Sequence, residues 1–201
     1  MKNHIKKLFL LAIASILIQG LMAQEQTLKY NVRVLGMDVG VLTVSEWIEN
    51  GDTVVEALTD VKVRIVFSYK VKYVQKCIYR NGELLNSSLL TYKKDRLNSS
   101  TYLTRKENGY DLVIDDESSY LNNRIKYSGS LLYFHEPSGI KELYYEISGE
   151  RKPIAAIGAH TYQVIDPDNG RESIFEYEDG KLKRSSVEHG IATIYKERLS
   201  D

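Results

Sequence analysis

Hydrophobic and polar residues alternate along most of the chain after Gln26. Residues 28–34 are the clearest example, because every second residue is apolar and the residues between them are polar or charged. A period of two is typical of a β-strand with one buried face, whereas a helix repeats its apolar positions about every 3.6 residues. The pattern therefore predicts a protein built mainly from half-buried strands.

The longest alternating segment covers residues 61–80. Most of its apolar and aromatic residues share one parity, all six of its basic residues share the other, and it contains no acidic residue. Two interpretations fit this segment: one long bent strand, or two strands broken near Ser68. The pair Asn81-Gly82 follows and favours a two-residue hairpin turn, since both residue types accept positive φ angles.

Turn signals separate further alternating segments along the rest of the chain. Short helices are candidates only at residues 128–135 and 118–124, and the second segment could equally form a loop. Pro137, Pro153 and Pro167 are all assigned to loops. We expect a mainly-β fold: an antiparallel curved sheet, or an open or half barrel, of about ten or more strands with at most one or two short helices. The other expected strands cover residues 39–48, 53–59, 84–93, 99–107, 110–115, 141–148, 161–165, 171–178, 181–187 and 191–197.

The N-terminus has the pattern of a secretory signal peptide. Residues 1–7 carry three lysines and no acid, residues 8–21 are almost wholly apolar, and Ala23 is a small residue before a polar stretch. The apolar run is shorter than the roughly 20 residues that a membrane-spanning helix needs, although a retained anchor is the alternative. We expect a signal peptide over residues 1–23, a single β-rich domain over residues 24–201, and no transmembrane helix after cleavage. The protein would then be exported, to the periplasm or out of the cell.

Charge and cysteine content narrow the function further. The whole chain balances 27 basic against 27 acidic residues, and removal of the signal peptide leaves it slightly acidic. A nucleic-acid-binding protein is usually clearly basic, so no nucleic-acid partner is expected. Cys77 is the single cysteine, which excludes an internal disulfide and predicts a buried, inert thiol. We expect no cofactor, and the oligomeric state does not follow from the sequence.

The basic residues of segment 61–80 form a candidate strip for an anionic ligand. Like charges on one strand face repel each other unless acids on neighbouring strands oppose them. Cross-strand pairing with acids such as Glu56 or Asp60 is therefore the alternative interpretation. A lipid headgroup or an acidic glycan is the ligand class that a cationic strip attracts. The six residues are Lys62, Arg64, Lys70, Lys72, Lys76 and Arg80.

Tyrosines continue the apolar parity of the same segment. Tyr69, Tyr73 and Tyr79 form a candidate aromatic groove, in which rings would stack on a sugar or hold an apolar chain. The alternative is ordinary packing, since a phenol commonly buries its ring and keeps its hydroxyl near a polar partner.

Patterns for catalysis or metal binding are weak. His135, His160 and His189 do not stand at ligand spacing to another histidine or to the cysteine. Residues 128–130 read Ser-Gly-Ser but lack the strand–turn–helix context of a nucleophile elbow. A hydrolase site would have to be assembled from loops around His135, Glu136 and His160, and we rank this hypothesis last.

Several short motifs together resemble an uncharacterised family of small exported bacterial proteins, defined only as a domain of unknown function. The resemblance implies an antiparallel, β-rich envelope or secreted domain with no assigned activity, and it supplies no catalytic residues. The architecture is also loosely similar to periplasmic curved sheets that carry lipids or lipoproteins. The motifs are at residues 36–40, 132–137, 144–146, 162, 167–170 and 177–180.

The leading hypothesis is an exported, non-catalytic β-sheet domain that binds an amphipathic or anionic component of the cell envelope. The partner would be a lipid, a glycan or an envelope protein. A small outer-membrane β-barrel is the first alternative, because the length and the hairpin rhythm allow about eight to ten strands. The chain ends in Arg-Leu-Ser-Asp rather than in an aromatic residue that closes a strand, which disfavours that alternative.

Overall fold

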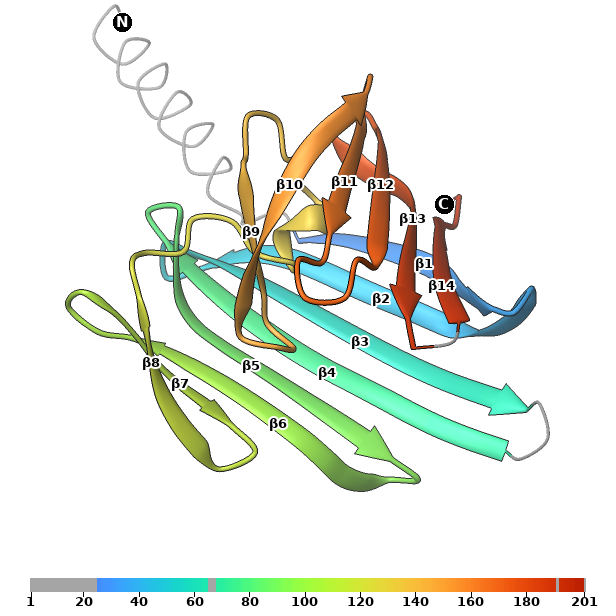
Figure 1. The fold of residues 1–201 in the computed structure, drawn as a ribbon, viewed down its shortest axis with the longest axis horizontal. Coiled ribbons are helices and arrows are strands. Elements are labelled where there is room, and N and C mark those ends of the chain that lie inside the picture. The colour runs from blue at the N-terminus through green and yellow to red at the C-terminus, as the bar shows by residue number, and fades with distance from the viewer. Residues whose placement is uncertain (1–24, 65–67, 191, 201) are drawn as a thin grey trace, which may run out of the picture.

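A computed structural model describes residues 25–64, 68–190 and 192–200, so the expected signal peptide lies outside the described residues. The described part contains fourteen β-strands and one short 3-10 helix (Figure 1). The elements are β1 (Gln26–Val34), β2 (Met37–Glu49), β3 (Asp52–Arg64), β4 (Ser68–Arg80), β5 (Glu83–Lys93), β6 (Arg96–Arg105), β7 (Gly109–Ile114), β8 (Glu117–Asn122), the 3-10 helix η2 (Leu131–Tyr133), β9 (Glu142–Tyr145), β10 (Glu150–Gly158), β11 (Thr161–Ile165), β12 (Glu172–Glu178), β13 (Lys181–His189) and β14 (Ala192–Arg198).

All fourteen strands belong to one antiparallel sheet in the order β8-β7-β6-β5-β4-β3-β2-β1-β14-β13-β12-β11-β10-β9. The first and last strands of the chain pair with each other, with Val32 opposite Lys196, so the two halves of the chain join in the middle of the sheet. Strands β8 and β9 are the two edges, and the sheet is curved but not closed (Figure 1). The mainly-β fold predicted from the sequence is confirmed.

The segment 61–80 forms two strands rather than one bent strand. β3 continues to Arg64 and β4 begins at Ser68, so the break lies next to the predicted position. Val61 stands opposite Val71 in this hairpin, which brings the apolar parities of both strands to the same face. Asn81 and Gly82 then connect β4 to β5 with φ angles of 53° and 75°, as a type I′ turn requires.

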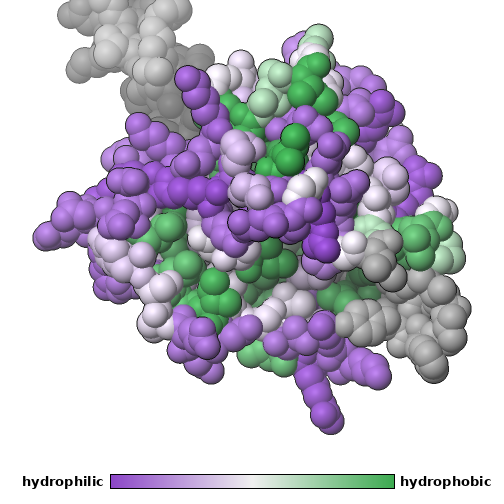
Figure 2. All heavy atoms as spheres, in the orientation of Figure 1, coloured by the Kyte–Doolittle hydropathy of each residue, from purple (hydrophilic) through white to green (hydrophobic). Residues whose placement is uncertain are grey.

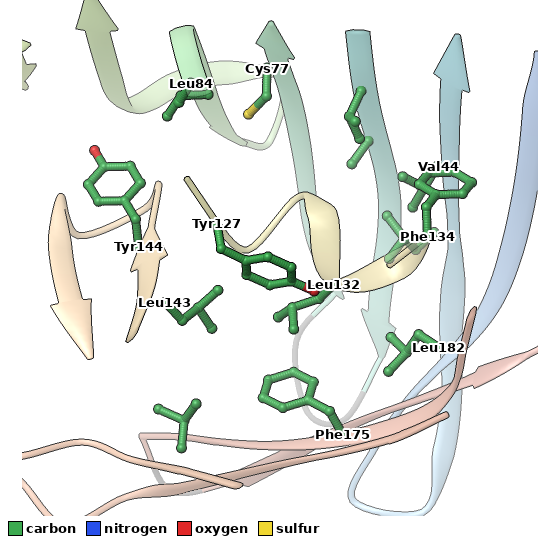
Figure 3. Close-up of a cluster of buried hydrophobic side chains, with 14 of the residues drawn as sticks. Val44, Cys77, Leu84, Tyr127, Leu132, Phe134, Leu143, Tyr144, Phe175 and Leu182 are labelled. Atoms are coloured by element: carbon green, nitrogen blue, oxygen red, sulfur yellow. The ribbon is translucent and has the colours of Figure 1, made fainter. Parts of the chain in front are cut away.

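The core lies on the concave inner face of the curved sheet. Figure 3 shows Val44 and Cys77 from the long strands facing Phe175 and Leu182 from the C-terminal half. Helix η2 occupies the space between the two halves and buries Leu132 there. The predicted helix at 128–135 is therefore reduced to a single turn.

The β9–β10 hairpin reaches from the C-terminal edge across the inner face of the N-terminal half. The hydroxyl of Thr101 on β6 donates to the carbonyl of Ile147 at 3.4 Å. Gly149 packs so closely that a Cβ atom there would lie 2.5 Å from Leu112 on β7. Arg151 of β10 donates to the carbonyls of Asn122, the last residue of β8, and of Asn123, at 3.1 and 2.9 Å. These contacts hold the two edges of the open sheet together at one end.

Two elements differ from the sequence prediction. Residues 118–124 contribute most of strand β8 instead of a helix or loop. Strand β10 was not predicted, and it includes Pro153, which was assigned to a loop. Pro153 is tolerated because it lies opposite Glu142, the first residue of β9, at the end of that pairing. Over the described ranges, no helix has the length and hydropathy needed to cross a membrane.

Candidate functional site

One end of the long strands β3 to β6 collects basic residues from two hairpins. The register places Lys62 opposite Lys70 in β3–β4 and Lys93 opposite Arg96 in β5–β6. The two hairpins lie side by side, since the backbone amide of Lys94 donates to the carbonyl of Lys70 at 3.1 Å. We call this group the basic tip: Lys62, Arg64, Lys70, Lys72, Lys93, Lys94 and Arg96.

Cross-strand register at the basic tip sets like charges against each other. Directly opposed residues on an antiparallel pair share a face at a distance of about 5 Å, and like charges in such positions are destabilising. The tip contains two such basic pairs, Lys62–Lys70 and Lys93–Arg96. A fold under selection for stability alone would place an acid in one position of each pair.

Acidic residues offset only part of this charge. The Lys70 ammonium lies 2.9 Å from a carboxylate oxygen of Asp95 in the β5–β6 turn. The Asp95 side chain is 73% exposed, so water screens this pair. Asp60 stands opposite Lys72 in the β3–β4 register. The sequence of these strand ends thus contains seven basic residues and two acids, Asp60 and Asp95, although the whole chain is neutral.

Apolar side chains accompany the charges at the tip. Leu97, directly after Arg96, is 57% exposed, and its register partner Tyr92 is half-buried. Basic residues beside exposed apolar and aromatic side chains are typical of surfaces that meet lipid headgroups. On the face shown in Figure 2, hydrophobic residues lie in separate patches among hydrophilic ones.

The opposite end of the same strands is electrically balanced. Arg80 donates to both carboxylate oxygens of Asp52, with Nε–Oδ1 and Nη2–Oδ2 distances of 2.8 and 2.6 Å. Lys76 lies 3.0 Å from Glu56. We call these four residues the paired end. Hydrogen bonds from Arg80 lower the pKa of Asp52, because they stabilise its charged form.

The predicted six-residue strip is thus divided by the structure. Lys62, Arg64, Lys70 and Lys72 belong to the basic tip, whereas Lys76 and Arg80 have acidic partners at the paired end. The side chains of Lys62 and Arg64 lie outside the described part, so only their strand positions enter the argument. Lys93, Lys94 and Arg96 were missed because they join the others only through the β4–β5 pairing. Binding of an anionic ligand stays a prediction.

The three tyrosines of the candidate aromatic groove spread along the inner face of β4. Tyr79 is buried near the paired end, and its hydroxyl lies 2.6 Å from the Ser130 hydroxyl. Tyr73 is half-buried, and the Tyr69 side chain lies outside the described residues. Six residues of strand separate Tyr73 from Tyr79, which is about 20 Å. Packing accounts for Tyr79, and the groove stays a prediction.

A buried carboxylate, missed in the sequence, lies beside Tyr79. Glu146, directly after β9, is only 4% exposed. It accepts hydrogen bonds from the backbone amides of Ser130 at 3.0 Å and Gly129 at 3.1 Å, and from the Ser128 hydroxyl. A Cβ atom at Gly129 would lie 2.7 Å from the carboxylate, so the Ser-Gly-Ser segment fits around this group. The arrangement ties β9 to the segment before η2.

The cluster is built for stability rather than for nucleophilic attack. The Cys77 thiol is buried and lies 3.5 Å from a Glu146 oxygen. Burial, and secondly the neighbouring carboxylate, raise the pKa of Cys77 well above its usual value. Burial likewise raises the pKa of Tyr79. Cys77 is therefore a buried thiol, as predicted, and in the described part of the chain the hydrogen-bond partners of the Ser128 and Ser130 hydroxyls are Tyr79, Glu146 and each other.

The residues of the hydrolase hypothesis fall into two separate pairs. His135 Nε2 lies 2.6 Å from Glu46 Oε1 on β2. Glu136 instead contacts His160 Nδ1 at 3.1 Å and accepts a hydrogen bond from the Tyr162 hydroxyl at 2.7 Å. These pairs attach the segment after η2 to strands of both halves. Only Glu136 and His160 are brought together as that hypothesis required.

Neither a metal site nor a surface depression in the described part of the chain gives a stronger candidate for ligand binding. No cluster of three or more histidine, cysteine, aspartate or glutamate residues suited to a metal ion occurs among the described residues. A surface depression of about 320 Å³ lies over β12 to β14 and β1. Most of its charged lining is internally paired, since Arg33 lies 3.1 Å from Glu197 and Arg184 lies 2.7 Å from Glu176, while the Lys196 ammonium donates to the Tyr133 hydroxyl. It therefore has no strong preference for a charged ligand.

Comparisons with known proteins agree with the fold. A family model described as a domain of unknown function, DUF6134, matches residues 30–198. No curated protein matches the chain. A solved structure titled a β-barrel-like protein of domain of unknown function DUF1849, from Brucella abortus, is similar with a TM-score of 0.57 at 8% identity, covering 89% of this chain and 96% of that chain. The expected relation to an uncharacterised family is confirmed, and the structural likeness concerns the fold alone.

Proposed function

The chain belongs to the DUF6134 family, whose function is unknown, and we propose that it is an exported, non-catalytic domain whose basic tip binds anionic lipid headgroups of the cell envelope. The observation that carries the proposal is the presence of two opposed basic pairs, Lys62–Lys70 and Lys93–Arg96, at one end of the sheet, where they lie on opposite faces of it. This register costs stability, and binding a polyanionic surface would offset that cost.

Lipid is favoured over a soluble acidic glycan by the side chains next to the charges. Leu97 is 57% exposed, and the register places it opposite the half-buried Tyr92, which in turn stands opposite Lys72, so these three residues share a face. Apolar and aromatic groups enter the boundary between headgroups and acyl chains, while Lys and Arg pair with phosphates. A soluble polyanion would contact the charges and leave Leu97 in water.

Export supports this role. The basic, apolar and small-residue regions of residues 1–23 would deliver the domain to the envelope, where anionic lipid surfaces are available. The net charge of the whole chain gives no general attraction to an anionic membrane. Attraction must then come from the local tip, which makes the proposal specific about where the contact lies.

Vesicle co-sedimentation tests the proposal. The purified protein is mixed with phosphatidylglycerol vesicles and, separately, with neutral phosphatidylcholine vesicles. We expect binding to the anionic vesicles that weakens with salt. Removing three charges with Lys72→Gln, Lys93→Gln and Arg96→Gln should weaken it about 100-fold, since each basic residue contributes about 1 kcal/mol near an anionic surface.

A matched variant controls for overall charge. Lys29→Gln, Lys126→Gln and Lys141→Gln remove three charges from exposed positions in β1 and in the loops around η2, and this variant should bind like the natural protein. Equal loss in both variants would show that net charge, rather than the tip, attracts the protein. Binding to polygalacturonate but not to vesicles would assign a glycan instead and overturn the lipid proposal.

A further inference from the structure

Strand β8 leaves one edge of the sheet unpaired. Its neighbour on one side is β7, and among the described residues no strand or bridge pairs with its other side. Five of its six residues are exposed, including Tyr120 at 50%. The other edge differs, because the backbone of Tyr144 in β9 bonds to Tyr127 and Gly129.

The β7–β8 hairpin determines which backbone groups of β8 point outward. Asp115 and Asp116 form its two-residue turn with φ angles of 48° and 72°, so Ile114 and Glu117 are the hydrogen-bonded pair next to the turn. Hydrogen-bonded and non-hydrogen-bonded pairs alternate along an antiparallel ladder. The outward amides and carbonyls consequently belong to every second residue: Ser118, Tyr120 and Asn122.

The edge carries few of the features that keep sheets from pairing with each other. Free edges are commonly protected by lysine, proline or a β-bulge, and β8 contains none of these. Its one charged residue, Glu117, lies at the start of the strand. The carbonyls of Asn122 and Asn123 are approached by Arg151, which leaves Ser118 and Tyr120 as the open centre.

We propose that β8 pairs antiparallel with β8 of a second copy of this chain, about a two-fold axis through Tyr120. Such a pair places Ser118 opposite Asn122 of the other copy, so outward backbone groups meet outward groups. The Asn122 carbonyl, which has two lone pairs, would then accept from the Ser118 amide as well as from Arg151. The charges are complementary in this arrangement. Asp115, Asp116 and Glu117 at one end of the strand come beside Arg124 and Arg151 at the other end of the partner strand. The two sheets then continue as one.

Sedimentation velocity over a range of protein concentrations tests this pairing. We expect a reversible monomer–dimer equilibrium in the purified full chain. Tyr120→Pro removes an outward amide without removing a bond to β7, and it should weaken the dimer at least tenfold. Tyr120→Ala retains the amide and is the matched control, so it should keep the dimer. Circular dichroism checks that each variant is folded.

A second measurement applies even if the proline variant does not fold. Glu117→Lys brings a positive charge to the positive end of the partner strand, and it should weaken the dimer severalfold. In hydrogen exchange, the amides of Ser118 and Tyr120 should gain protection as the protein concentration rises. A monomer at all concentrations up to about 0.5 mM, or a dimer that forms without protecting these amides, would overturn the pairing. Protection that appears only with a different protein would also overturn it.

Discussion

The two ends of β3 and β4 use the same residue types in opposite ways. At the paired end, Asp52 and Glu56 on β3 stand beside Arg80 and Lys76 on β4. At the basic tip, Lys62 on β3 stands opposite Lys70 on β4, and no acid takes part in that register position. Both ends lie on the same two strands and, by register, on the same face of the sheet, so the difference lies in the choice of charge.

This difference separates stability from binding. The buried cluster around Glu146 lies at the same end of β4, where Cys77, the residue after Lys76, contacts the Glu146 carboxylate. Changes at that end should lower the free energy of unfolding and leave vesicle binding intact. Removing basic charges at the tip should weaken vesicle binding without lowering the free energy of unfolding. The reason is that the like charges of the tip oppose folding and attract an anionic surface.

The largest expected effect is on stability, from Glu146→Gln. Glu146 now accepts hydrogen bonds from the backbone amides of Gly129 and Ser130. The NH2 group of glutamine is itself a donor, so it would face one of these amides without forming a hydrogen bond to it. Leaving such buried groups unsatisfied should lower the free energy of unfolding by about 2–3 kcal/mol, measured by urea denaturation. Glu107→Gln, on an exposed turn, should have no effect. If the folded Glu146→Gln variant bound vesicles more weakly, stability and binding would not be separated between the two ends.

A smaller effect should distinguish two lysines on one strand. Lys72 and Lys76 lie on the same face of β4, at the tip and at the paired end respectively. Lys72→Gln should weaken binding to phosphatidylglycerol vesicles about fivefold, since it removes about 1 kcal/mol of attraction. Lys76→Gln should leave that affinity unchanged. Co-sedimentation of both variants in parallel measures the difference, and equal affinities would contradict the division of the strip.

Charge reversal should change stability with opposite signs at the two ends. Arg96→Glu replaces the like-charge pair with Lys93 by an attractive one, and should raise the free energy of unfolding by roughly 0.5 kcal/mol. Lys76→Glu sets two acids opposite each other with Glu56 and should lower it by a similar amount. Urea denaturation of both variants tests the signs. A lower free energy of unfolding in Arg96→Glu would contradict the claim that repulsion between like charges destabilises the tip.

The smallest expected effect is a pH dependence at the paired end. Because Arg80 lowers the pKa of folded Asp52, the pair stabilises the protein above the ordinary pKa of about 3.8, and this stabilisation is lost as pH falls through the lowered value. Asp52→Asn should therefore melt below the natural protein at pH 7. The difference in melting temperature should shrink once the pH is well below 4. A difference independent of pH would assign the effect to something other than this pair.

The sequence predicts the long strands well because each has one buried and one solvated face. Residues 28–34 and 61–80 alternate so regularly that their strand structure follows directly, whereas the choice between one strand and two for residues 61–80 did not follow from the pattern. Edge and hairpin strands are harder. β8 is almost wholly polar, and β10 contains Pro153, so neither has the alternation that marks a strand. Their positions depend on the strands beside them.

The candidate site was predictable only in part, for a related reason. Lys70 and Lys72 follow from parity along one strand, but Lys93 and Arg96 join them through the pairing of β4 with β5. The acids that neutralise Lys76 and Arg80 are likewise fixed by register. Glu146 looks like an ordinary polar residue of a strand, and its burial depends on the distant Ser-Gly-Ser segment.

The orientation of the bound protein tests the central claim most directly. An environment-sensitive fluorophore is attached to Leu97→Cys at the tip or to Ile48→Cys, which is 48% exposed near the paired end. Cys77 is buried and should remain unlabelled. With phosphatidylglycerol vesicles, the probe at position 97 should shift to shorter wavelengths and the probe at position 48 should not. A shift at position 48 alone, or equal shifts at both, would contradict binding through the basic tip.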